Sequence, residues 1–359
     1  MEIEDFKDKK ITIMGIGLHG GGVGAIKFFH KIGAKITATD LRTADELKES
    51  LEILKNLEGI EFVLGEHREK DFKEADFVIK NPAVPDDSKY LKIAQEAGVK
   101  IETDIGVFFE LCPGHIVGVT GSRGKSTTST LIHLFLKTKY PDAVLAGNIR
   151  ASVLEKLDKI GEKTPVVLEL SSWQLAGLAS HKKSPPISII TSIMPDHMNR
   201  YASMDEYIAD KKVIFQFQKP EDFLILNADN RITRRFAPEA ESRVYFYSAK
   251  EMPLSEDLKT KQIVRIGAYF SRKKIFFGAA KEKIADVSRI KLAGEHNLSN
   301  ILAAVSAARL FDIPTESTRK VLAEFTGLEG RIQLIKEIKG VKYINDTTAT
   351  IPEATIAAM

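Results

Sequence analysis

The sequence lacks the features of an extracellular or membrane-bound protein. Cys112 is its only cysteine among 359 residues, which excludes an internal disulfide framework and fits a reducing compartment. The first ten residues, MEIEDFKDKK, are charged where a secretion signal would be apolar, and no apolar run reaches membrane-spanning length. We therefore expect a cytoplasmic protein without membrane insertion.

An excess of charge of one sign is also missing. Lys and Arg together number 52 and Asp and Glu 49, so the net charge of +3 gives no footprint for nucleic acid. The apolar fraction of 43% and the charged fraction of 28% are ordinary for a globular protein, and the length suits two or three domains. No internal repeat or low-complexity tract is present.

Short β-rich runs alternate with helical patterns along almost the whole chain, which predicts an α/β protein with mostly parallel sheets. The first series of runs begins with KKITIMGIG at residues 9–17 and ends with VKIETD at residues 99–104. A helical pattern covers Val23 to Lys31, between the first two strands. This series predicts a first domain at residues 1–112.

A second series of strands and helices follows Pro113. It begins with HIVGVT at residues 115–120 and ends with the helical stretch LSNILAAVSAARLF. Residues 267–278, GAYFSRKKIFFG, have the pattern of an antiparallel hairpin. We expect a second domain at residues 113–326. Residues 327–359 contain a charged strand pair, a further strand and a helix start, and are too few to bury a core of their own.

The stretch GVTGSRGKSTTSTLIHLFLK, residues 118–137, has the composition of a phosphate-binding loop. The backbone N–H groups of a Gly-rich turn and of a helix N-terminus point at an anion, and Lys125 adds a positive charge. Ser126 or Thr127 can offer a hydroxyl to Mg²⁺. The strict phosphate-loop pattern has glycine where Val119 stands. The alternative is a chance Gly-Lys-Ser turn, which the preceding strand and the following helix disfavour.

A second glycine-rich turn, Gly15-x-Gly17-x-x-Gly20, lies between a strand and a helix, and Asp40 ends the next strand. This spacing is typical of dinucleotide-binding sites, in which the acidic residue contacts a ribose. The pattern predicts that a nucleotide or phosphorylated ligand meets a helix N-terminus. The alternative is that these glycines serve only a tight turn.

Three further polar residues follow or end apolar strands of the second series. Glu169 ends one strand, where a carboxylate can face the Mg²⁺ of a bound nucleotide. A buried neutral glutamate is the disfavoured alternative. His197 follows another strand, and Lys211 lies fourteen residues later. A lone histidine is more often structural than a ligand. A ligand-binding role for His197 is nevertheless favoured, because ligands bind outside the carboxyl ends of such strands, where Lys125 is also expected.

Seven motifs in this order resemble the Mur ligase family of peptidoglycan synthesis, and ELSSWQL and DHMNRY most resemble its D-glutamate-adding branch. The resemblance runs from Gly15 to the last residue. It implies a Rossmann-like UDP-binding domain, a central P-loop-type ATPase domain and the start of a third α/β domain. The motifs are TGSRGKST, GNI, ELSSWQL, DHMNRY, LNADN, GEHNLSN and NDTTAT.

The resemblance also implies the reaction. A carboxylate of UDP-N-acetylmuramoyl-L-alanine attacks the γ-phosphate of ATP and gives an acyl phosphate. The amine of glutamate then displaces phosphate and leaves a new amide. Two anions must approach one another, so cations are needed at the site, and the family supplies two Mg²⁺ ions. A monomer is expected, with these substrates as its partners.

Site residues are carried over from the family motifs, position by position. The implied catalytic residues are Lys125, Glu169, His197 and Lys211. The implied ATP-binding residues are Gly121, Ser122, Arg123, Gly124, Lys125, Ser126, Thr127, Asn297, Asn300, Arg331 and Asp346. The implied UDP-sugar-binding residues are Gly17, Leu18, His19, Asp40, Arg42, Asn148 and His197. The implied metal ligands are Ser126, Glu169, His197 and Lys211, the last as a carbamate formed with CO₂.

Two places near the end of the chain depart from the family pattern. Gly330-Arg331 stands where the family has His-Arg, and Thr348 stands where it has a lysine near the incoming amino acid. These changes leave an L-glutamate-adding relative as an alternative. The family has a complete third domain, whereas this chain ends at Met359. We therefore expect this chain to bind nucleotide but to turn over poorly or not at all.

Rival interpretations remain within and outside this enzyme class. A folylpolyglutamate synthetase-like ligase shares the central domain and the acyl-phosphate chemistry, but it normally begins close to its phosphate loop. A nicotinamide-dependent oxidoreductase would use the first glycine-rich turn and leave Lys125, Glu169 and His197 without a role. A noncatalytic nucleotide-binding module is the third alternative, and substrate-dependent phosphate release would separate it from a ligase.

Overall fold

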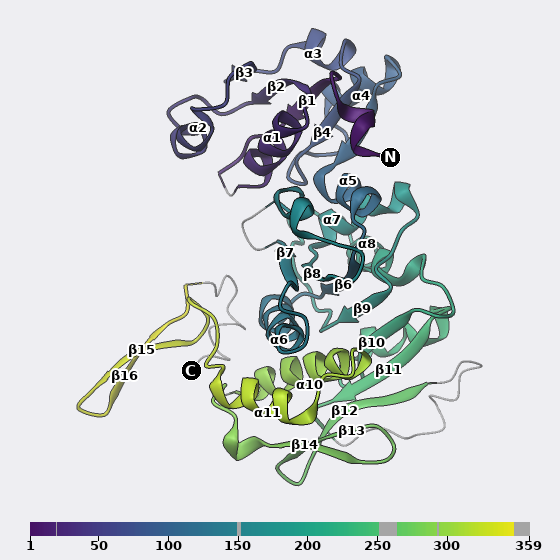
Figure 1. The fold of residues 1–359 in the computed structure, drawn as a ribbon, viewed down its shortest axis with the longest axis vertical. Helices are drawn as coiled ribbons and strands as arrows, with labels where there is room; N and C mark the ends of the chain where they lie inside the picture. Colours follow the sequence, from purple (N-terminus) through teal and green to yellow (C-terminus); the bar gives the residue numbers. More distant parts are fainter. Residues whose placement is uncertain (19, 149–151, 251–263, 293, 348–359) are drawn as a thin grey trace.

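The computed structural model describes residues 1–18, 20–148, 152–250, 264–292 and 294–347, whose strands form three sheets. Figure 1 shows the first sheet at the top, a larger sheet below it and a separate hairpin at the lower left. The α/β class predicted from the sequence is confirmed. The division into domains at residues 112 and 326 stays a prediction.

The first sheet has five parallel strands in the order β3-β2-β1-β4-β5. Its strands are β1 (Lys10–Met14), β2 (Lys35–Asp40), β3 (Ile60–Leu64), β4 (Phe77–Lys80) and β5 (Lys100–Thr103). Its helices are α1 (Gly21–Lys31), α2 (Lys48–Leu54), α3 (Glu69–Lys73), α4 (Lys89–Glu96) and α5 (Asp104–Leu111). Because the strands are parallel, the loops that follow β1, β2 and β4 meet at one edge.

The second sheet has nine strands in the order β14-β13-β12-β11-β10-β9-β6-β8-β7. Pairing is parallel from β7 to β12 and antiparallel from β12 to β14. The hairpin predicted at residues 267–278 is confirmed as β12–β13. The strands are β6 (His115–Thr120), β7 (Val144–Gly147), β8 (Pro165–Glu169), β9 (Ile187–Ile190), β10 (Phe223–Asn227), β11 (Arg243–Ser248), β12 (Arg265–Ser271), β13 (Lys274–Phe277) and β14 (Glu282–Asp286). The sequence did not reveal β7 or β14.

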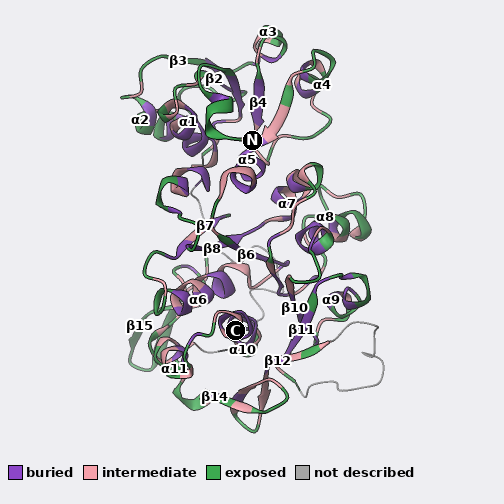
Figure 2. Ribbon diagram, turned by 45° about the vertical axis from the view of Figure 1, so that its right-hand side comes forward, coloured by how far each residue is buried: buried purple, intermediate pink, exposed green. Residues whose placement is uncertain are grey.

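Helices bury both faces of the second sheet. Successive strand residues point to opposite faces, so Val117 lies in one apolar cluster and its neighbour Ile116 in the other. On one side lie α6 (Lys125–Lys137), α10 (Glu295–Leu310) and α11 (Thr315–Glu324), and on the other α7 (Ser172–Leu178) and α8 (Met204–Gln216). Figure 2 shows buried residues concentrated along these layers. Within the described part of the chain, no helix is both long and apolar enough to cross a membrane.

The third sheet is the hairpin β15 (Gln333–Ile338) and β16 (Val341–Asn345). The sequence analysis placed KYIN in a strand beyond the charged pair, but KYIN belongs to β16 and is the second member of that pair. A Gly340 turn brings the two runs together. The helix start predicted at the end of the chain lies outside the described residues.

The first sheet and the second sheet share one continuous apolar core. Phe6 and Ile13 of the first unit belong to the same buried cluster as Leu154 and Leu175 of the second. A Cβ built on Gly24 of α1 would lie 2.3 Å from Cβ of Ser152, so only glycine allows this close approach. The contact continues through α5, which packs against the short helix η2 (Leu154–Lys159) and α7.

An ion-pair cluster of one histidine and two carboxylates connects the two units at the same junction. His181 lies in the short helix η3 (Ala179–His181), and its Nε2 lies 2.9 Å from Oε2 of Glu102. Its Nδ1 lies 3.2 Å from Oε1 of Glu110, which also pairs with Lys183 and with the amino terminus of Met1. Bonding to Glu102, partly opposed by burial, raises the pKa of His181 above its usual value.

We expect this cluster to stabilise the protein at acidic pH. Because the pKa of His181 is raised on folding, its contribution is fully present below about 6.5 and is lost as the pH rises through the folded-state pKa. The contribution should be about 1 kcal/mol. Urea unfolding of the wild type and of His181→Gln should show a larger stability difference at pH 5.5 than at pH 8.5. A difference that does not change with pH would rule out this ion pair as its source.

Candidate active site

The phosphate-binding loop lies between β6 and α6, as the sequence predicted. Gly124 has φ +85°, and a Cβ placed on it would lie 2.1 Å from Oδ1 of Asn300 on α10. Asn300 in turn donates from Nδ2 to Oδ1 of Asn297 at 3.2 Å, and both side chains are buried. The structure therefore brings Asn300 of α10 against this loop, and Asn297 contacts Asn300.

Lys125 is the first residue of α6 and turns back over its own loop. Its Nζ donates to the carbonyl oxygens of Gly121 at 2.9 Å and Ser122 at 3.3 Å. Burial lowers the pKa of Lys125, while the negative charges of Glu169 and Asp196 act in the opposite direction. The ammonium is thus held at the loop between two carboxylates, where it can meet the charge of a transferred phosphate.

Glu169 ends β8 and is 2% exposed. Its Oε1 accepts a hydrogen bond from Nδ2 of Asn148, which follows β7, at 3.2 Å. Its Oε2 is buried and has no hydrogen-bond partner among the described residues. A buried carboxylate oxygen without a partner is costly, so the site has the chemistry to receive a cation.

Lys211, on α8, is 1% exposed. Its Nζ donates to Oγ1 of Thr120 at 3.3 Å and to the carbonyl oxygen of Gly121 at 3.2 Å, and lies 4.8 Å from the ring centre of Tyr207. Burial, reinforced by the positive charge of Lys125, lowers its pKa well below the usual value for lysine. A lowered pKa raises the fraction of neutral amine, which is the reactive form of a lysine.

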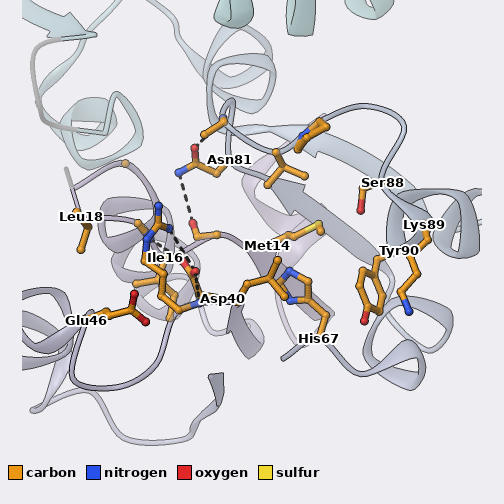
Figure 3. Close-up of a pocket in the computed structure, with 18 residues that line it drawn as sticks. Met14, Ile16, Leu18, Asp40, Glu46, His67, Asn81, Ser88, Lys89 and Tyr90 are labelled. Carbon is orange, nitrogen blue, oxygen red and sulfur yellow. Dashed lines mark hydrogen bonds and ion pairs between the residues drawn. The ribbon is translucent and has the colours of Figure 1, made fainter. Parts of the chain in front are cut away.

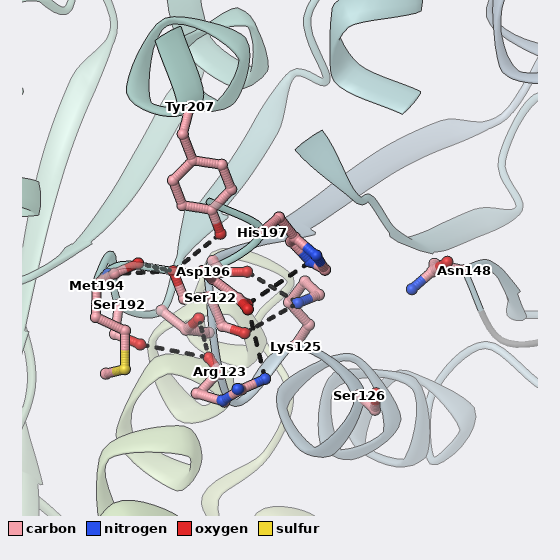
Figure 4. A network of polar contacts seen from close by, with 12 residues as sticks. Ser122, Arg123, Lys125, Ser126, Asn148, Ser192, Met194, Asp196, His197 and Tyr207 are labelled. Carbon is pink, nitrogen blue, oxygen red and sulfur yellow. Dashed lines mark hydrogen bonds and ion pairs between the residues drawn. The ribbon is translucent and has the colours of Figure 1, made fainter. Parts of the chain in front are cut away.

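His197 lies in the turn after β9 and has the left-handed φ of +57°. Its Nε2 lies 3.7 Å from Oδ2 of Asp196, and the same oxygen lies 3.7 Å from Nη1 of Arg123 (Figure 4). Burial lowers the pKa of His197, which favours the neutral imidazole that binds metal ions. Asp196 was not predicted from the sequence, although an acidic residue next to a histidine beyond a strand end is a usable signal.

The remaining predicted nucleotide contacts lie at the start of the third unit. Nη2 of Arg331 donates to Oγ of Ser126 at 3.0 Å, so Arg331 reaches the phosphate loop. Oδ1 of Asp346 accepts from the backbone N–H of Ile332 at 3.1 Å and thereby fixes the backbone next to Arg331. Asp346 thus acts on this site through the chain that carries Arg331.

The first glycine-rich turn opens into a pocket of about 620 Å³ at the carboxyl edge of the first sheet (Figure 3). The predicted residues Gly17, Leu18, Asp40 and Arg42 all line it, and His19 lies outside the described residues. Oδ2 of Asp40 accepts from the N–H of Gly17 at 3.0 Å, and its Oδ1 accepts from the N–H of Arg42 at 3.0 Å. Asp40 therefore shapes the pocket wall with both of its oxygens.

Asn81 contributes to this pocket and was not predicted. It follows β4, donates from Nδ2 to the carbonyl oxygen of Gly15 at 3.4 Å, and accepts from the N–H of Ala83 at 3.0 Å. Figure 3 shows it beside the turn that carries Leu18. A polar residue directly after a parallel strand, in KNPAV, was the signal that could have identified it.

Two residues assigned to the UDP-sugar site lie outside the pocket of the first sheet, and their assignment stays a prediction. Asn148 and His197 do not line the pocket of the first sheet. They lie on the second sheet's edge near Lys125 and Ser126 (Figure 4). The structure thus contains a pocket on one sheet and a polar site with two lysines on the next, and Asn148 and His197 lie at the latter.

Comparison with known protein families gives two matches. Residues 9–103 match the N-terminal domain described as Mur ligase MurD-like, and residues 119–308 match the Mur ligase middle domain. The chain is 43% identical over 357 residues to the UDP-N-acetylmuramoylalanine–D-glutamate ligase of Roseiflexus sp. and 38% identical over 364 residues to that of Acetivibrio thermocellus. The alignments cover 98% and 100% of this chain and 75% and 74% of those relatives.

Solved structures resemble the fold. UDP-N-acetylmuramate:L-alanyl-γ-D-glutamyl-meso-diaminopimelate ligase from Neisseria meningitides has a TM-score of 0.62 at 15% identity, with 89% of this chain and 99% of that chain covered. UDP-N-acetylmuramate–alanine ligase from Thermotoga maritima has a TM-score of 0.59 at 20% identity, with 97% and 76% covered. These likenesses extend over both sheets.

Proposed function

Because the chain belongs to the Mur ligase family, with a MurD-like N-terminal domain, we propose that it is a UDP-N-acetylmuramoylalanine–D-glutamate ligase of peptidoglycan precursor synthesis. It uses ATP to join the alanine carboxylate of the UDP-sugar to the amine of glutamate. The structural observation that carries the proposal is the site around Lys125, where cationic groups and the unpartnered Glu169 oxygen face one phosphate loop.

The two phosphate-binding turns divide the substrates between them. The pocket beside Gly17 and Asp40 would hold the UDP moiety, with backbone N–H groups at the start of α1 facing its phosphates. The loop before α6 would hold the ATP phosphates, with the asparagines of α10 close by. Asn148 would contact the reacting carboxylate between these sites, since it lies beside Glu169.

The chemistry follows from charge. The alanine carboxylate must approach the γ-phosphate, and Lys125 lowers the repulsion between these anions as the acyl phosphate forms. The glutamate amine then attacks the activated carbonyl carbon, phosphate leaves, and the amine loses a proton. Holding the two reacting groups in place contributes much of the rate because a step between separate molecules becomes effectively unimolecular.

The residues present fit Mg²⁺. This ion is usually held by one or two carboxylates together with substrate phosphates and water, so a site with a single protein carboxylate is suitable. The observation that supports such a site is the buried Oε2 of Glu169, which has no hydrogen-bond partner among the described residues. Ser126 and Glu169 would hold one ion, and His197 and Lys211, as a carbamate, would hold the other. When bound, Mg²⁺ would neutralise phosphate charge.

The specificity for glutamate is tested by phosphate release. In this and every later turnover experiment the chain is extended to the full length of its relatives, because the chain alone, which spans about 75% of them, is expected to turn over poorly. With ATP and UDP-N-acetylmuramoyl-L-alanine, we expect phosphate release to depend on D-glutamate and to be at least about tenfold slower with L-glutamate. Substrate-dependent release also distinguishes a ligase from a nucleotide-binding module. Faster release with L-glutamate would instead identify an L-glutamate-adding relative, and release that needs no amino acid would contradict a ligase.

A further inference from the structure

Arg200 connects the second sheet's site to the wall of the first sheet's pocket. It lies in the turn that begins with Asp196 and His197, and its backbone N–H donates to the carbonyl oxygen of His197 at 2.9 Å. Its Nη2 donates to the carbonyl oxygens of Pro82 and Ala83, each at 3.4 Å. Arg200 therefore links the turn that carries His197 to the loop that forms one wall of the first sheet's pocket.

The backbone that Arg200 contacts is part of the first pocket. Ala83 lines that pocket, and its N–H is held by Oδ1 of Asn81, whose amide also contacts the carbonyl oxygen of Gly15 in the glycine-rich turn. A ligand that orders this turn also acts on the loop from Asn81 to Ala83. The contacts from Arg200 are at the long end of the hydrogen-bond range, so a small movement of the loop changes them substantially.

On its other side, Arg200 contacts an aromatic residue of the reacting site. Its guanidinium carbon lies 4.3 Å from the ring centre of Trp173, which is a favourable cation–π geometry. The rings of Trp173 and His197 lie 5.1 Å apart. Nε1 of Trp173 is buried and has no hydrogen-bond partner among the described residues. The orientation of the indole, and with it the neighbouring imidazole, therefore depends on Arg200.

We propose that Arg200 is a positioning residue that couples occupation of the first pocket by a uridine diphosphate group to the orientation of Trp173 and His197. The inference rests on the proposed function, which places the UDP moiety in that pocket. Arginine suits this task because its planar guanidinium can stack on a ring and donate sideways at the same time. A lysine ammonium lacks this geometry.

The test uses Trp173 as its own reporter, since it is the only tryptophan of the chain. UDP is added to the wild type, and its binding is followed by calorimetry and by tryptophan emission. We expect both signals to give one Kd. In Arg200→Gln, UDP should bind with a Kd within about threefold of the wild type, but most of the change in emission should be lost. Arg200→Lys should recover only part of it.

Turnover supplies a second readout. If Arg200 positions the reacting groups, Arg200→Gln should slow acyl-phosphate formation roughly tenfold at saturating UDP-sugar, because misplacement lowers the rate without weakening binding. Arg231→Gln is the matched control, because this exposed arginine lies on α9 (Arg231–Arg234), outside both sites. It should behave as the wild type in both experiments.

The possible outcomes distinguish the coupling through Arg200 from the proposed function of the protein. UDP that binds by calorimetry while Trp173 emission stays constant in the wild type would overturn the coupling and leave the proposed function intact. An emission change that persists undiminished in Arg200→Gln would do the same. Failure of UDP to bind at all would contradict the substrate assignment, and the coupling would be rejected with it.

Discussion

Replacing Lys125 with alanine is expected to lower the rate of acyl-phosphate formation by about a thousandfold or more. Its ammonium donates to the loop carbonyls of Gly121 and Ser122, and the negative charge of Glu169 favours its charged form. UDP-sugar binding should be nearly unchanged, because that pocket is built on the first sheet. The rate is measured by trapping the acyl phosphate with hydroxylamine, and the affinities by calorimetry.

Lys137→Ala provides the control for this substitution. Lys137 lies at the opposite end of the same helix, is exposed, and should be dispensable. The decisive comparison is between the two ligands. A Lys125→Ala protein that loses as much affinity for the UDP-sugar as for ATP would show that the two turns do not serve separate substrates.

Lys211 should prove almost as important for a different reason. With its pKa lowered by burial, its amine is available to attack the carbon of CO₂, forming an N–C bond and releasing one proton. The carbamate would offer oxygen ligands where an ammonium would repel a metal ion. Lys211→Met keeps the apolar stem in its buried position but cannot be carbamylated, and we expect it to lose activity at least about a hundredfold.

Carbamylation can also be observed without turnover. In ¹³C-bicarbonate, the wild type should give a carbamate carbon signal that Lys211→Met lacks. Lys212→Met is the matched control, since Lys212 is the neighbouring lysine and pairs with Glu239 instead. It should keep both signal and activity, and acetate should restore part of the activity of Lys211→Ala. A wild type without the signal, or a fully active Lys211→Met, would refute the modification.

The residues that the sequence located best are those whose chemistry depends on strand ends. Lys125, Glu169 and His197 each lie beyond an apolar strand, and parallel strands bring such positions to one edge. Their proximity could be expected before the structure was known. The same logic applied to Asn81, but in that case the signal was not used.

Other parts of the site depend on contacts that local sequence patterns do not encode. Arg200 and Pro82 are far apart in the chain, and nothing in either motif indicates that they touch. Strand β7 was missed because it has only four residues, follows a Pro-Asp turn and ends in a glycine of its own. Asp40 was assigned to the UDP-sugar site, which stays a prediction, and its oxygens also bind the backbone of that pocket, a role that depends on how two loops meet.

The continuous core between the first two sheets limits how this chain can be recombined. Consider a chimaera that takes residues 1–112 from this chain and the rest from a relative. Its α1 and α5 would then pack against the relative's η2 segment, whereas in this chain Gly24 of α1 leaves just enough room for Ser152. The salt bridges Lys27–Glu155 and Lys31–Asp158 cross the same seam. A working chimaera of this chain should therefore carry residues 152–160 together with the first unit, because these residues pack against α1 and pair with its lysines.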